Sequence, residues 1–141
     1  MTGGRELSWD GCVNVRDLGG RGRLRPGAAI ANATPGCVVF HCASGKDRIG
    51  QLALVLLTLA EAAPEEIIAD YLVTFDRLKQ RYDELGVRDQ LAAVTELLAA
   101  HDTAVEASLT STITSLRMPD FLLDNGLSDT ELAALRTRLT G

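Results

Sequence analysis

One stretch, residues 38–50, constrains the fold more than any other: Val-Val-Phe-His-Cys-Ala-Ser-Gly-Lys-Asp-Arg-Ile-Gly. A β-branched and aromatic run is followed by a loop of small residues and then by the start of an apolar helix, a pattern typical of a strand–loop–helix turn. In such a turn, the backbone N–H groups of the loop and the positive end of the helix point at one small volume. The stretch therefore predicts an anion-binding site.

Two side chains add chemistry to this site. Cys42 opens the loop and Arg48 closes it, with five residues between them. Free N–H groups at a helix start lower the pKa of a cysteine from about 8.5 to roughly 3.5–7.5, so we expect Cys42 to be a thiolate. The guanidinium of Arg48 is a planar fork of donors suited to two oxygens of a phosphate. We predict a nucleophilic thiolate beneath a phosphate cradle.

Composition narrows the class of protein. The chain has 141 residues, enough for one domain with its own core, and its net charge of −5 argues against general nucleic-acid binding. Three cysteines and two histidines form no metal-ligand spacing, so we expect no metal site and no cofactor.

The apolar run Ile49–Ala60 is too short to span a bilayer, so we expect no stable membrane insertion. The odd cysteine count and the lack of a secretory signal favour the cytoplasm. We interpret Cys12 and Cys37 as small buried apolar residues, with a redox role that shields Cys42 as the alternative.

We expect a single domain over residues 1–141 in three parts. Residues 1–36 should form N-terminal strands and loops, residues 37–50 a strand and the phosphate-binding loop, and residues 51–141 helices. The expected strands are Val13–Arg16, Cys37–Phe40 and, as either a strand or a connector, Ala28–Ala31.

Helix start and stop signals divide the second half of the chain. The first helix, Ile49–Ala62, is apolar on nearly every face and should be buried at the centre. The other expected helices run from Pro64 to near Gly86, around Leu91–Leu98, from a Thr103/Glu106 capping box, over Pro119–Leu123, and from a Ser128/Glu131 capping box. Tyr71, Phe75 and Tyr82 fall at helical spacing and are interpreted as core residues.

Two motifs carry a family resemblance. The string His41-Cys42-x5-Arg48, with Gly-Lys-Asp-Arg at its end, resembles the signature loop of the bacterial protein tyrosine/serine phosphatases. Upstream, Asn14-Val15-Arg16-Asp17-Leu18-Gly19-Gly20 resembles the Asn-x-Arg-Asp-x-Gly-Gly segment of the same family. The resemblance implies an α/β, cysteine-phosphatase-like fold with a reduced parallel sheet and a helix-rich C-terminal half.

The resemblance also implies roles for individual residues. Cys42 would take the phosphoryl group as a thiophosphate intermediate, and Arg48 would hold two of its oxygens. His41 would hydrogen-bond near Cys42 and help to hold its thiolate, and Lys46 hints at tolerance for strongly charged or lipid substrates. The phosphate-binding residues would be Ala43, Ser44, Gly45, Lys46, Asp47 and Arg48, supported by His41, Asn14, Arg16 and Asp17.

The chain departs from the family pattern in two places. Ile49 stands where the family usually has a Thr or Ser whose hydroxyl helps the thiolate to leave, which predicts slow release of phosphate from Cys42. Only Ala28–Gly36 separates Pro26-Gly27 from Cys37, whereas the family has a long segment there that includes the general acid. No other Asp or Glu lies between Asp17 and Asp47. Either one of these two would then donate the proton, or the enzyme would be weak or would act only on good leaving groups.

The sequence thus predicts a metal-independent phosphomonoester hydrolase resembling protein tyrosine phosphatases. The alternative is a degenerate relative that binds phosphorylated ligands or a partner with little turnover. Its substrate would be a phosphorylated protein, a phosphoinositide or a small phosphomonoester. A thin sheet would expose an edge and a helix face, so we also expect a homodimer.

Overall fold

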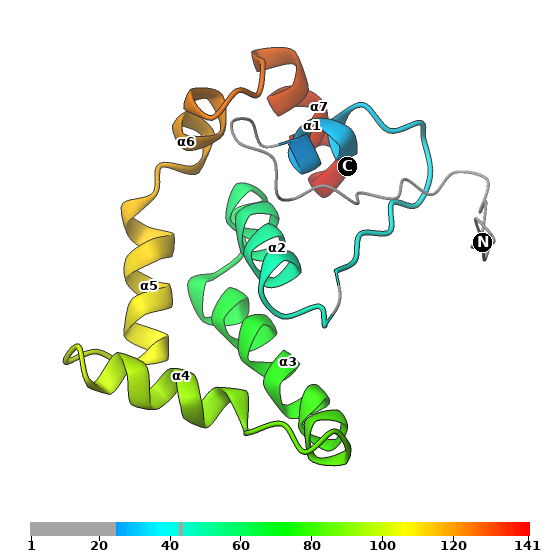
Figure 1. Cartoon of the computed structure of the whole chain (residues 1–141). Coiled ribbons are helices and arrows are strands. Elements are labelled where there is room, and N and C mark those ends of the chain that lie inside the picture. Colours follow the sequence, from blue (N-terminus) through cyan, green and yellow to red (C-terminus); the bar gives the residue numbers. More distant parts are fainter. Residues whose placement is uncertain (1–24, 43) are drawn as a thin grey trace, which may run out of the picture.

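The structure is a computed structural model that describes residues 25–42 and 44–141 (Figure 1). Within these ranges the chain forms helices and connecting loops, with no β-strand. The helices are α1 (Arg25–Ala31), α2 (Arg48–Leu59), α3 (Pro64–Glu84), α4 (Gln90–Ala99), α5 (Val105–Ser115), α6 (Met118–Asp124) and α7 (Asp129–Thr140). None of the helices in the described ranges is long and apolar enough to cross a membrane.

The expected parallel sheet is wrong for the described residues. Ala28–Ala31 lies in α1, because alanine is the best helix former and Pro26 sits in the first turn, where its missing N–H costs nothing. Residues 37–40 are extended, but a strand exists only where its N–H and C=O groups pair with a neighbour, and the described chain supplies none. Residues 13–16, the other expected strand, lie outside the described residues.

The extended segment still keeps the alternation of a strand. Val38 and Phe40 are half-buried against the main hydrophobic cluster, whereas Val39 between them is exposed. Apolar burial, rather than strand pairing, therefore holds this segment in place as it approaches Cys42.

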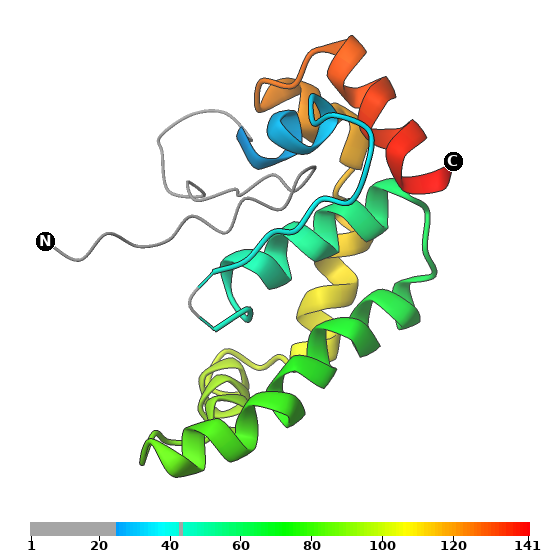
Figure 2. The ribbon, with the colours of Figure 1, turned by 90° about the vertical axis from the view of Figure 1, so that its right-hand side faces the viewer.

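Helix α2 is the central element, as the sequence predicted. It lies between the α1–α6–α7 group and α3 (Figures 1 and 2). Its Leu52, Leu56 and Leu59 belong to the main cluster, and Leu54 belongs to a second cluster. The other buried members of the main cluster are Ile30, Ala31, Met118, Leu122, Leu127, Leu132 and Leu135.

The second cluster joins α2 to α3 and α5 through Leu54, Ile67 and Ile113. Ile67 is 1% exposed and is the best-buried residue of α3. The expected start of α3 at Pro64 is confirmed, and Gly86 follows its end with a φ of +64°, the left-handed conformation that suits glycine. Helix α3 is thus fixed against α2 along its N-terminal half.

The two expected capping boxes have different outcomes. The Ser128/Glu131 box is confirmed at the start of α7. The Thr103/Glu106 box is wrong, because α5 starts one residue later than expected, with Ala104 as its N-cap and no side-chain cap. A capping box requires the Ser or Thr at the N-cap itself, so a shift of one residue removes it.

One guanidinium ties the chain that leaves α1 to the last helix. Arg138 in α7 donates hydrogen bonds to the carbonyl oxygens of Thr34 and Gly36, at 3.1 and 3.2 Å, and to that of Ala33. Hydrogen bonds from charged donors are stronger than neutral ones. Arg138 therefore fixes the loop that leads into the extended segment and towards Cys42.

Replacing Arg138 tests whether its hydrogen bonds to the chain after α1 stabilise the fold. We expect Arg138→Ala to lower the free energy of unfolding by about 1–3 kcal/mol, because three carbonyl groups lose a charged donor. Urea unfolding followed by circular dichroism measures the change. Arg136→Ala is the matched control, since Arg136 is exposed on the same helix and its side chain makes no hydrogen bond to the described residues. Equal losses of unfolding free energy in the two variants would contradict a stabilising role of the Arg138 hydrogen bonds.

Candidate phosphate-binding site

The loop between the extended segment and α2 runs from Cys42 to Asp47. Gly45 has a φ of +75°, which turns the chain back towards Cys42 and favours glycine over any other residue. The amide of Gly50 then donates to the carbonyl of Lys46 at 3.1 Å, and that of Gln51 to Asp47 at 3.0 Å. These bonds begin α2 directly after the loop.

The Cys42 sulfur lies within this turn of backbone. The amide N–H of Gly45 donates to Sγ at 3.1 Å. Burial raises the pKa of the thiol, but backbone N–H groups of Ile49, Gly45 and Ser44, together with the charge of Arg48, outweigh it and hold the pKa below its ordinary value. The loop therefore stabilises a thiolate.

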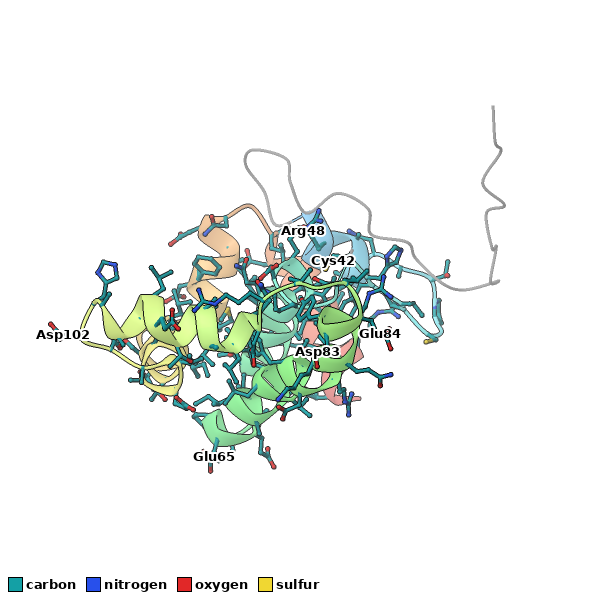
Figure 3. All side chains as sticks on the ribbon, turned by 60° about the horizontal axis from the view of Figure 1, so that its bottom comes forward. Cys42, Arg48, Glu65, Asp83, Glu84 and Asp102 are labelled. Atoms are coloured by element: carbon teal, nitrogen blue, oxygen red, sulfur yellow. The ribbon has the colours of Figure 1, made fainter. Side chains whose placement is uncertain are left out.

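Arg48 is the first residue of α2, and its side chain is exposed. Cys42 and Arg48 lie close together at the junction of loop and helix, whereas Glu65 and Asp102 lie far from it (Figure 3). The Arg48 guanidinium makes no hydrogen bond or ion pair with the described residues, and its charge acts on Cys42, so it can receive an anion at the loop.

Lys46 points away from solvent. Its side chain is only 10% exposed, and its ammonium forms an ion pair with the carboxylate of Asp47, whose side chain is 66% exposed. The Lys46 ammonium also lies over the ring of Phe75 in α3, 5.6 Å from the ring centroid, within the range of a cation–π interaction. Lys46 thus lies beneath the loop, against α3.

Asp47 occupies the N-cap position of α2 but does not cap it. An Asp at this position usually accepts a hydrogen bond from an N–H of the first helical turn. No such side-chain bond is formed by Asp47, because its φ of −80° and ψ of −73° are already helical and its carboxylate pairs with Lys46. In the first turn of α2, the N–H of Ile49 faces the Cys42 sulfur, whereas that of Gly50 donates to the carbonyl of Lys46.

The face of α3 beneath the loop is aromatic. The rings of Tyr71 and Phe75 are 6.0 Å apart in a tilted arrangement. A Cβ at Gly50 would lie 2.9 Å from Cε2 of Tyr71, so only glycine lets α2 approach this ring so closely. The sequence placed Tyr71 and Phe75 in the core, but it did not show that they support the loop, because their four-residue spacing identifies a helix face and not its neighbour.

One predicted site residue is not joined to the cysteine, and four others are not described. His41 is exposed, and no hydrogen bond joins it to Cys42. Ala43, Asn14, Arg16 and Asp17 lie outside the described residues. Their roles and that of His41 stay predictions.

Cys37 corrects one expectation. It is exposed rather than a small buried residue, because it stands at the start of the extended segment, before the positions that pack on the core. Over residues 25–42 and 44–141, no group of three or more His, Cys, Asp or Glu residues could hold a metal ion.

Comparison with known proteins identifies the family. The model of the tyrosine phosphatase family matches residues 24–141, so the chain belongs to this family. A tyrosine-protein phosphatase from Nostoc commune is 32% identical over 123 aligned residues, which cover 78% of this chain and 41% of that protein. A candidate tyrosine-protein phosphatase from Cupriavidus necator is 37% identical over 79 residues, covering 51% of this chain and 28% of that protein.

The chain thus spans less than half the length of these curated relatives. No solved structure gave a significant match. The family match agrees with the resemblance drawn from the His41–Gly50 loop, whereas the upstream motif at residues 14–20 precedes the matched range.

The lowered pKa of Cys42 has a measurable consequence for reactivity. We expect iodoacetamide to alkylate Cys42 at half its maximal rate at a pH below about 8.5, the value of a free cysteine. Peptide mass spectrometry over a pH series measures the rate at Cys42 alone. Arg48→Met should move this midpoint up only slightly, because the Arg48 charge is the smallest of the contributions. A midpoint at or above that of free cysteine would refute the stabilised thiolate.

The same shift links pH to stability. Below the lowered pKa both folded and unfolded thiols are protonated, so Cys42 contributes nothing. Between that pKa and the value of the unfolded thiol only the folded state loses its proton, so the free energy of unfolding should rise with pH and reach its full gain above this window. Cys42→Ser should remove this rise.

Proposed function

We propose that the chain carries the catalytic loop of a metal-independent phosphomonoester hydrolase that resembles protein tyrosine phosphatases. The observation that carries this proposal is the turn of backbone N–H groups around Cys42 Sγ, with the exposed Arg48 beside it. Membership of the tyrosine phosphatase family supports it.

In the proposed reaction, the Cys42 thiolate attacks phosphorus and forms an S–P bond while the bond from phosphorus to the leaving oxygen breaks. Arg48 and the loop amides hold the non-bridging oxygens, where negative charge must be stabilised throughout the transfer. Water then attacks the phosphorus of the cysteinyl-phosphate, which releases inorganic phosphate and restores the thiolate.

The leaving alcohol requires a proton in the first step. Asp17 and Asp47 are the candidates from the sequence, and Asp47 could donate the proton only after it leaves its ion pair with Lys46. A general acid is typically worth 10²–10⁴-fold, and its contribution grows as the leaving group becomes more basic. Comparing Asp47→Asn on aryl and alkyl phosphates distinguishes the two candidates.

The substrate classes predicted from the sequence stay open within this proposal: a phosphorylated protein, a phosphoinositide or a small phosphomonoester. The burial of Lys46 favours a ligand that needs only Arg48 as an exposed cation at the loop. A homodimer remains our expectation for the assembly, and light scattering measures it.

Hydrolysis of an aryl phosphate tests the proposal. We expect Cys42→Ser to abolish turnover, because the serine hydroxyl is not ionised at neutral pH. We expect Arg48→Lys to reduce kcat/KM by at least tenfold, since a lysine cannot hold two oxygens in one plane. Vanadate binding that depends on Arg48, without any turnover, would instead identify the degenerate phosphate-binding relative.

Ile49 generates a separate prediction about the second step. Because isoleucine offers no hydroxyl to the departing thiolate, release of phosphate from Cys42 should be slower than its formation. Rapid-quench kinetics should then show a burst of one leaving group per site. Ile49→Ser should shorten the slow phase, and the lack of a burst in the unaltered chain would argue against a slow second step.

A further inference from the structure

The feature that the proposed reaction does not use is the side chain of Lys46. It is buried although it is charged, and buried charges require compensation. Two partners supply it: the Asp47 carboxylate and the ring of Phe75. Phe75 is itself only 6% exposed, so the position of the ammonium is set from α3.

The position of Lys46 decides where the Asp47 carboxylate lies. Asp47 directly precedes the first turn of α2, so a free carboxylate there would be attracted to the N–H groups of Arg48 and Ile49, the second of which faces Cys42. A carboxylate there would occupy these donors and repel a phosphate dianion. Its ion pair with Lys46 holds it elsewhere, and the helix has no side-chain cap.

We propose that Lys46, anchored on Phe75, is a positioning residue that keeps the Asp47 carboxylate away from the first turn of α2 and so keeps the N–H groups of Arg48 and Ile49 available to phosphate. Lys46 does not itself contact the ligand. The inference rests on the proposed function only in taking phosphate as the ligand of the loop.

Direct contact between Lys46 and phosphate is the competing explanation, and the two differ in their dependence on Asp47. If Lys46 binds phosphate, its loss weakens binding whether or not residue 47 carries a charge. If Lys46 restrains Asp47, its loss matters only while that carboxylate is present. A double-mutant cycle separates these two cases.

The experiment measures binding of inorganic phosphate by calorimetry to the full chain, Lys46→Met, Asp47→Asn and the double variant. Methionine keeps the unbranched stem of lysine without its charge. We expect Lys46→Met to weaken phosphate binding by roughly tenfold relative to the unaltered chain. The double variant should bind phosphate within about threefold of the single variant Asp47→Asn. If Lys46→Met costs the same factor in both backgrounds, the inference is wrong.

Replacing Phe75 is a second, independent test of the inference, and it has a matched control. Phe75→Leu keeps an apolar side chain but removes the ring face, so we expect it to weaken phosphate binding by roughly threefold and to add nothing in the Lys46→Met background. Phe121→Leu makes the same change in α6, next to the main cluster. It should lower stability without changing phosphate binding, and equal effects of the two variants on binding would overturn the anchoring role.

A readout without phosphate keeps this inference apart from the proposed function. The pH midpoint of Cys42 alkylation should rise in Lys46→Met, because the freed carboxylate competes for the amides that stabilise the thiolate, and Asp47→Asn should reverse the rise. If the chain binds phosphate or responds in alkylation but never turns over a substrate, the proposed function fails and this inference stands. If Lys46→Met leaves the midpoint unchanged, the inference fails whatever the turnover.

Discussion

The candidate site depends on the position of backbone N–H groups at the start of one helix, α2. Backbone N–H groups at the beginning of α2, together with that of Gly45, face Cys42, and they lower the pKa of its thiol against the effect of burial. Such donors favour an anion only if the helix cannot shift. Both hydrophobic clusters include residues of α2, so its position is set from two sides.

The loop itself is held at both ends by other helices. On its N-terminal side, Arg138 of α7 binds the carbonyl groups of the chain that leaves α1. On its C-terminal side, the aromatic face of α3 supports Lys46 through Phe75. The last helix and the longest helix therefore both act on a loop that neither of them contains.

Features of the fold and the site could be predicted from the sequence where the residues that determine them lie close together in the chain. Helix boundaries at Pro64 and at the Ser128 capping box were predictable, because their signals lie within a few residues of each other. The sheet was not, because a strand depends on partners remote in sequence, and Ala28–Ala31 followed its local helix preference instead. The loop with Cys42 and Arg48 could be recognised as a sequence motif. The contact of Lys46 with the Phe75 ring could not, because it depends on how α2 packs on α3, which no local pattern specifies.

The close approach of Gly50 to Tyr71 has a consequence for the variation that this chain can accept. A side chain at position 50 would need the space that the Tyr71 ring occupies, so the two positions cannot change independently. A library that randomises residues 42–50 alone would return glycine at position 50, whatever ligand it was selected to bind. Altering position 50 therefore requires a smaller residue at position 71 at the same time, so variation at the start of α2 depends on α3.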